Sequence, residues 1–105
     1  MVILQSQLDL DEYAEDNEDF AIYFYADWCG PCFYVNKAID RWGNETKTHS
    51  IAKVNIDKCE VLREFFDIEN IPCFLFIKKG EISDRFEGAD CNRLKKKFDA
   101  FFNTK

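Results

Sequence analysis

Two cysteines that flank a glycine and a proline offer the clearest chemistry in this sequence: Cys29-Gly30-Pro31-Cys32. Glycine permits a close approach of the backbone, while proline fixes its own φ and lacks the N–H that a first helical turn would leave unpaired. An apolar run, 21–26, precedes the pair, and apolar residues at helical spacing follow it. Both thiols are therefore expected in the turn between a strand and a helix. The amides and the dipole of a helix N-terminus favour a thiolate, the form of cysteine that attacks disulfides.

The hydrophobic pattern predicts the elements that would position this pair. Residues 21–26 are continuously apolar, as in a strand that is covered on both faces. The helix after the pair is expected to end near Gly43-Asn44 or to run on towards Lys47. The other expected elements are an edge strand at 2–4, a helix from Ser6 to about Asn17, a strand at 51–56, a helix capped by Asp57 with Glu60 in its capping box, a strand at 73–77, a turn at 78–81, a hairpin strand at 82–86 and a last helix capped by Asp90.

This order of elements predicts an α/β fold, with a central mixed sheet of about five strands flanked by about four helices. A chain of 105 residues has the length of one domain, so we expect a single domain over 1–105. Hydrophobic residues make up 47% of the chain and Phe occurs 11 times, so a core can form without disulfide bonds.

The charge balance and the cysteine count limit which partners and which cellular compartment we expect for this protein. The formal net charge is −6, which argues against nucleic acid and against an anionic membrane as partners. Residues 1–5 are too short and uncharged for a signal peptide, and the longest apolar runs have strand length. We therefore expect a reducing, cytoplasmic environment, where paired cysteines are more often catalytic or metal-binding than structural. The count of five cysteines leaves at least one thiol unpaired.

The segment Trp28-Cys29-Gly30-Pro31-Cys32 resembles the signature of thioredoxins, and four further segments fit in the same order. Residues 53–57 resemble the family's third strand, and 78–81 its hairpin turn. Ile71-Pro72 is similar to its cis-proline site, and Gly88 to the glycine that lies near the docked substrate. The resemblance covers the whole chain and implies the thioredoxin fold of a free-standing cytosolic thioredoxin. A C-x-x-C pair near a βαβ pattern is itself a recognised cue for this family.

The resemblance implies a role for each matching residue. Cys29 would be the exposed attacking sulfur of a dithiol protein-disulfide reductase, and Cys32 would resolve the mixed disulfide. Main-chain hydrogen bonds along an extended substrate would supply docking. The residues that would bind the substrate are Trp28, Gly30, Pro31, Ile71, Pro72 and Gly88.

The resemblance also implies the partners. These are disulfide-containing proteins as substrates and an NADPH-dependent thioredoxin reductase that recycles the oxidised pair. The chain contains no Gly-rich dinucleotide loop, so NADPH would act only indirectly and no cofactor or metal would be bound. We expect the protein to act as a monomer.

Three positions depart from the family pattern. Tyr23 stands where the family usually carries a buried Asp that helps to deprotonate the resolving thiol, while its usual Lys partner is present as Lys53. In one interpretation Lys53, hydrogen-bonded to the Tyr23 hydroxyl, takes over part of the proton handling at Cys32. In the other, Tyr23 only fills the space. Phe33 replaces a residue that is often basic, and Lys37 replaces a helix-kinking Pro, and both changes could alter the choice of partner.

Alternatives remain at the other cysteines and for the function. Cys73 either lies close enough to the site to be oxidised or is a quiet strand thiol, and Cys59 and Cys91 are expected at helix starts. His49 is expected in a loop. The main alternative function is a redox-inert binding or chaperone module on the same fold. A zinc or iron–sulfur site would need a second closely spaced pair. Oxidases and isomerases of this family usually carry other residues between the cysteines and a secretory address.

Overall fold

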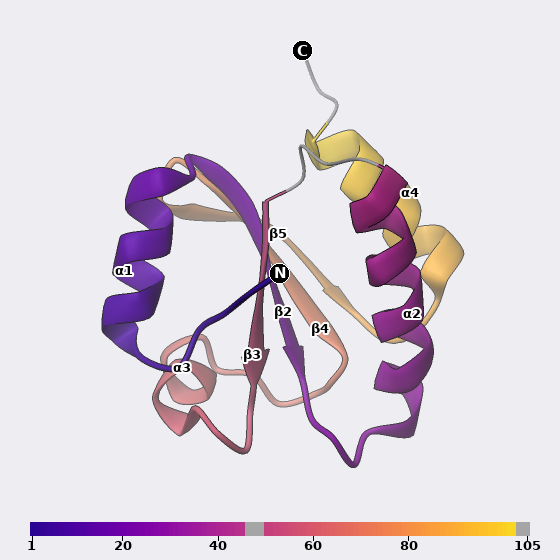
Figure 1. Ribbon diagram of the computed structural model, residues 1–105, viewed down its shortest axis with the longest axis horizontal. Helices are drawn as coiled ribbons and strands as arrows, with labels where there is room; N and C mark the ends of the chain where they lie inside the picture. The colour runs from indigo at the N-terminus through magenta and orange to yellow at the C-terminus, as the bar shows by residue number, and fades with distance from the viewer. Residues whose placement is uncertain (46–49, 103–105) are drawn as a thin grey trace.

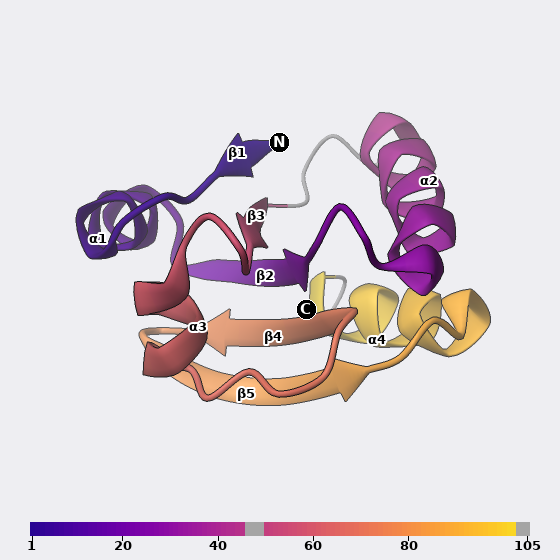
Figure 2. The same cartoon turned by 90° about the horizontal axis from the view of Figure 1, so that it is seen from below.

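The computed structural model describes residues 1–45 and 50–102, in which a sheet lies between two pairs of helices (Figures 1 and 2). His49 and Lys47 lie outside the described residues. The elements follow one another as β1 (Val2–Ile3), α1 (Gln7–Asp16), β2 (Asp19–Tyr25), α2 (Gly30–Glu45), β3 (Ile51–Asn55), α3 (Glu60–Phe65), β4 (Cys73–Lys78), β5 (Glu81–Glu87) and α4 (Cys91–Phe102). Within these ranges no helix is long and apolar enough to cross a membrane.

The sheet is five-stranded and mixed, with the strand order β1-β3-β2-β4-β5. The central strand, β2, runs parallel to β3 on one side and antiparallel to β4 on the other. Its burial on both faces explains why residues 21–26 read as one continuous apolar run. The predicted α/β fold, with a five-stranded mixed sheet and four helices, is confirmed.

Two hydrophobic clusters fill the spaces between the sheet and its helices. Figure 1 shows α1 and α3 on one face of the sheet and α2 and α4 on the other. Alternate residues of β2 serve the two clusters: Ile22 and Phe24 pack on the α1/α3 side, while Ala21 and Tyr23 pack on the α2/α4 side. Because both faces of β2 are held, its carboxyl end, which leads directly to the cysteine pair, has a fixed position.

The helix starts agree with the sequence in two places and differ in one. The Ser6 hydroxyl accepts a hydrogen bond from the Asp9 N–H at 3.1 Å, and the Asp90 carboxylate accepts one from the Arg93 N–H at 3.1 Å, so both predicted caps are present. The predicted cap of α3 by Asp57 is wrong, because α3 begins at Glu60 with Cys59 as its N-cap.

Strand and helix ends otherwise lie close to their predicted positions. The α2 helix continues through Gly43-Asn44 and reaches Glu45. The turn between β4 and β5 contains Lys79 with φ 51° and Gly80 with φ 82°. Two consecutive residues with positive φ suit the tight reversal of a hairpin, and glycine adopts this backbone without strain.

Candidate active site

The cysteine pair lies where β2 leads into α2. Cys29 and Cys32 form a disulfide, with their Cα atoms 5.3 Å apart. Cys29 immediately precedes α2, and its Sγ accepts a hydrogen bond from the Cys32 N–H at 3.2 Å. This is the contact that an N-cap side chain normally makes with the first turn of a helix. The sulfur of Cys29 therefore occupies the position where helix amides and the helix dipole favour negative charge.

The two cysteines differ in exposure. Cys29 retains 7% of its surface and Cys32 only 1%. Both belong to the hydrophobic cluster on the α1/α3 side of the sheet, and Ile71 packs against the same cluster. Cys29 is thus the more exposed residue of a pair in which both members are buried.

Trp28 stands beside the pair and is held by an acidic residue that the sequence pattern assigned to a helix cap. Its side chain is 69% exposed, and its indole Nε1 donates to the Asp57 carboxylate at 2.8 Å. The Asp57 N–H in turn donates to the Asn55 side-chain oxygen at 3.0 Å. Asn55 also donates to Asp27 at 3.4 Å, so the ends of β2 and β3 are joined by side chains. Asp57 and Asn55 are site residues that periodicity could not indicate.

The segment that leads into β4 lies at the same edge of the sheet. Phe24, near the end of β2, is the register partner of Cys73, the first residue of β4. The peptide bond between Ile71 and Pro72 is cis, as the resemblance implied. The Pro72 carbonyl accepts a hydrogen bond from the Gly88 N–H at 2.9 Å, and Gly88 has φ 112°, a conformation that favours glycine. The structure thus brings the segment before β4 together with the end of β5.

Tyr23, on β2, contacts the first turn of α2. Its side chain is fully buried, and its hydroxyl donates to the Cys32 backbone carbonyl at 3.3 Å. The ring stacks between Tyr25 and Phe74, with centroid distances of 5.3 and 4.6 Å. Burial raises the pKa of Tyr23 well above its ordinary value, so the hydroxyl is a neutral donor.

Lys53 lies on β3 opposite Tyr23 in the parallel register, but its amino group is directed elsewhere. The Nζ atom lies 4.7 Å from the centroid of the Tyr25 ring, a cation–π arrangement. The Tyr23 hydroxyl donates its hydrogen bond to the Cys32 carbonyl instead. The hydrogen bond between Lys53 and Tyr23 that the sequence suggested is therefore replaced by two separate contacts.

The remaining cysteines lie in two kinds of environment. Cys73 is fully buried, and burial raises the pKa of its thiol to about 11. Cys59 is buried at the N-cap of α3, and Cys91 is half-buried as the first residue of α4, so both occupy the predicted helix starts. Because its pKa is raised, the Cys73 thiol stays protonated at neutral pH, which favours the interpretation of Cys73 as an unreactive buried thiol.

The surface around the pair is aromatic. Phe33 and Tyr34, in the first turns of α2, are 55% and 67% exposed, and their rings contact each other edge to face. Lys37 places its Nζ 4.5 Å from the Phe33 ring centroid. The two residues that depart from the family pattern on α2 are therefore in contact with each other. Within residues 1–45 and 50–102, no group of three or more His, Cys, Asp or Glu side chains could hold a metal ion.

A disulfide across the first turn of a helix, with one sulfur at the helix N-cap, is suited to thiol–disulfide exchange, in which a thiolate attacks a disulfide sulfur. The fold and this pair together define a protein-disulfide oxidoreductase.

The chain belongs to the thioredoxin family, since the sequence model described as Thioredoxin matches residues 2–100. Thioredoxin-T of Drosophila melanogaster is 35% identical over 91 residues, which cover 84% of this chain and 58% of that protein. Thioredoxin H2 of Arabidopsis thaliana is 30% identical over 91 residues, covering 87% of this chain and 68% of the plant protein. This chain thus spans somewhat more than half of the length of Thioredoxin-T.

Solved structures agree with this assignment. The X-ray structure of Fasciola hepatica thioredoxin superposes with a TM-score of 0.91 at 29% identity, over 96% of this chain and 99% of that one. Plasmodium falciparum thioredoxin gives a TM-score of 0.90 at 27% identity, over 96% and 99% of the two chains. The resemblance suggested by the cysteine motif is confirmed at the level of family and fold.

Proposed function

We propose that this chain reduces disulfide bonds in other proteins through Cys29 and Cys32. The observation that carries the proposal is the unequal exposure of the two residues, 7% for Cys29 against 1% for Cys32, in a pair that already forms a disulfide. In the reduced protein, the Cys29 thiolate attacks a substrate disulfide, forms a mixed disulfide and releases the first substrate thiolate. The Cys32 thiolate then attacks Cys29 Sγ, closes the internal disulfide and releases the second. The substrate gains two electrons, and the pair loses two.

Recycling needs an external donor of two electrons. An NADPH-dependent thioredoxin reductase is the donor that family membership favours. In this scheme the chain binds no cofactor and touches NADPH only through the reductase. The reducing cytoplasm is the compartment that fits three further cysteines that remain free thiols. We further propose that residues 1–105 act as a single domain and a monomer.

Substrate docking is assigned to the edge of the sheet around Cys29. The Pro72 carbonyl and the Gly88 N–H bond to each other, and an extended substrate segment would lie beside them as an added strand. The exposed Trp28 ring would cover the segment from the other side. The residues of this proposed surface are Trp28, Gly30, Pro31, Ile71, Pro72 and Gly88.

Proton handling at Cys32 is assigned to Lys53 and Tyr23. Tyr23 supplies a fixed, neutral hydrogen bond to the Cys32 carbonyl and so holds the resolving residue in place. Lys53, half-buried over the Tyr25 ring, supplies a positive charge near the end of β2. The cation would favour the Cys32 thiolate while the mixed disulfide is resolved.

The test is to trap the intermediate. In Cys32→Ser, the mixed disulfide at Cys29 cannot be resolved, so a covalent complex with a disulfide-containing protein such as insulin should accumulate. Cys29→Ser should trap nothing, and Cys59→Ser should turn over like the wild type. If the wild type reduces no disulfide and Cys32→Ser traps no partner, the reductase is excluded, and the exposed aromatic surface of Trp28 and Phe33 would instead favour a redox-inert binding module.

A further inference from the structure

A polar network on the edge strand β5 contacts the loop between α3 and β4, residues 66–72, which includes Ile71 and Pro72. We propose that Arg85 and Glu87 are positioning residues for protein substrates and act through this loop. The inference rests on the proposed function, because it assigns a task to the surface where a substrate segment would dock.

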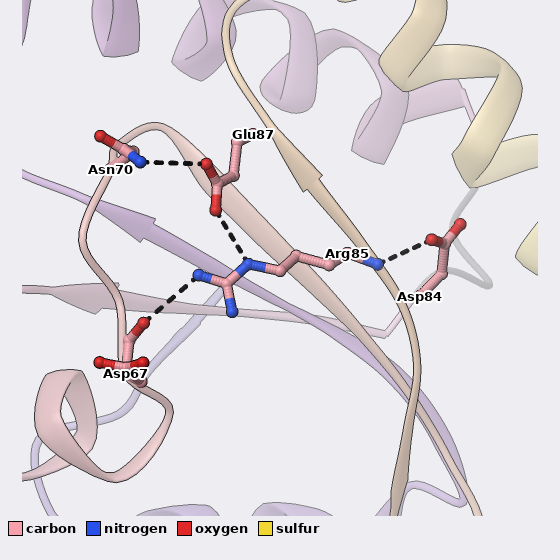
Figure 3. A network of polar contacts seen from close by, with 5 residues as sticks. All are labelled: Asp67, Asn70, Asp84, Arg85 and Glu87. Atoms are coloured by element: carbon pink, nitrogen blue, oxygen red, sulfur yellow. Dashed lines mark hydrogen bonds and ion pairs between the residues drawn. The ribbon is translucent and has the colours of Figure 1, made fainter.

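The network consists of one ion pair with two contacts to the loop (Figure 3). Arg85 Nε donates to Glu87 Oε1 at 3.0 Å. The other carboxylate oxygen of Glu87 accepts from the Asn70 side chain at 3.2 Å, and a terminal nitrogen of Arg85 donates to the Asp67 carbonyl at 3.4 Å. A single pair on β5 therefore reaches the loop at two points, Asp67 and Asn70.

A third contact between the end of β5 and the loop is a backbone hydrogen bond. Gly88 directly follows Glu87, and its N–H donates to the Pro72 carbonyl at 2.9 Å. Glu87 is also the register partner of Cys73, where β4 begins. The end of β5 thus holds the loop at successive points up to the start of β4, with the side-chain contacts before Pro72 and the backbone contact at Pro72.

The first part of the loop is fixed from the other side by α3. The Ile68 N–H donates to the Arg63 carbonyl at 3.0 Å, and Arg63 Nε donates back to the Ile68 carbonyl at 3.3 Å. Asp67, with φ 53°, is the left-handed residue that follows the C-cap of α3, a position where Asp adopts this conformation more readily than most residues. Loss of the Arg85–Glu87 pair should therefore release the middle of the loop, around Asn70 and Ile71, while α3 and β4 keep their places.

This location separates two classes of substrate. A protein disulfide needs the main chain around Pro72 for docking, so it depends on the position of the loop. A small disulfide needs only access to Cys29 Sγ, which belongs to the turn before α2. The pair on β5 should then affect the rate with protein disulfides and leave the rate with small disulfides unchanged.

The experiment uses Arg85→Met, which keeps an unbranched apolar stem and removes the guanidinium. The fully reduced protein is mixed with insulin or with the uncharged 2-hydroxyethyl disulfide, and the single-turnover rate constants are compared. We expect about a three- to tenfold fall with insulin and no change with the small disulfide. Glu87→Ala should behave like Arg85→Met, and Glu87→Gln should recover part of the loss because the amide oxygen still accepts a hydrogen bond.

Lys97→Met is the matched control. It also removes one positive charge that pairs with β5, through the Lys97–Asp84 contact at 2.7 Å, and that pair is 35% and 47% exposed against 38% for each partner of Arg85–Glu87. Among the described residues no hydrogen bond joins this pair to the loop, although the other oxygen of Asp84 accepts from the Arg85 backbone N–H at 2.8 Å. The control should therefore match the wild type with both substrates. An equal fall with both substrates, or no fall with insulin, would contradict the proposal. A wild type that reduces neither substrate would instead contradict the proposed reductase.

Discussion

At the scale of single residues, Tyr23 separates what a pattern can predict from what it cannot. Its place in a buried central strand followed directly from the apolar run around it. The direction of its hydroxyl, towards the Cys32 carbonyl rather than towards Lys53, depends on rings contributed by Tyr25 and Phe74. Stacking between side chains on neighbouring strands is set by the packed core, so a single sequence gives no sign of it.

Lys53→Met tests the proposed proton handling at the same scale. Removing the cation should disfavour the Cys32 thiolate, so resolution of the mixed disulfide at neutral pH should slow about three- to tenfold and its pH–rate profile should move to higher pH. Rapid-quench measurement of mixed-disulfide decay across pH provides the profile. Lys58→Met, which removes an exposed lysine next to Asp57, is the control. A pH–rate profile that stays in place in Lys53→Met would contradict the proposed role of Lys53 in proton handling.

At the scale of elements, the strands and helices could be predicted because burial imposes a period on the sequence. The period shows which face of a strand or helix is inside. It does not show which exposed polar side chains meet across distant segments. Asp57 fits a capping box by spacing, yet its carboxylate holds Trp28 instead. The contact between Arg85 and Asp67 lies equally outside the pattern, because both residues are exposed.

The Asp57–Trp28 contact can be tested by Asp57→Ala. The indole would lose a charged acceptor, so its ring should move more freely, and reduction of insulin should slow about two- to fivefold. The Trp28 indole N–H signal in the nuclear magnetic resonance spectrum reports the lost hydrogen bond. Glu60→Ala removes a nearby exposed acid at the start of α3 and should change neither quantity. If the indole signal stays where it is in Asp57→Ala, Asp57 does not hold the ring.

At the scale of the whole molecule, buried groups with raised pKa values connect stability to alkaline pH. Burial raises the pKa of Tyr13, Tyr23 and Tyr25, and it raises the pKa of Cys73 from 9.0 to about 11. The unfolded chain loses these protons at a lower pH than the folded chain. Their contribution to stability is therefore complete below the unfolded values and is lost as the pH rises through the folded ones.

Cys73→Ala should flatten this dependence. Between about pH 8 and pH 10.5, in the presence of a reductant, the free energy of unfolding of the wild type should fall by about 1–2 kcal/mol more than that of Cys73→Ala. Urea unfolding at several pH values measures the difference. A curve for Cys73→Ala that runs parallel to the wild type would show that its thiol ionises equally easily in the folded and unfolded chains.

Cys29 caps α2 and is also the proposed attacking residue, so its chemical state can be followed at the start of the helix. Cys29 Sγ accepts the Cys32 N–H while it is part of the internal disulfide, and its strength as an acceptor changes when it becomes a thiolate or joins a mixed disulfide. Amide hydrogen exchange at Cys32 should then record each chemical state of Cys29. The helix carries its own spectroscopic reporter of the redox cycle, with no label added.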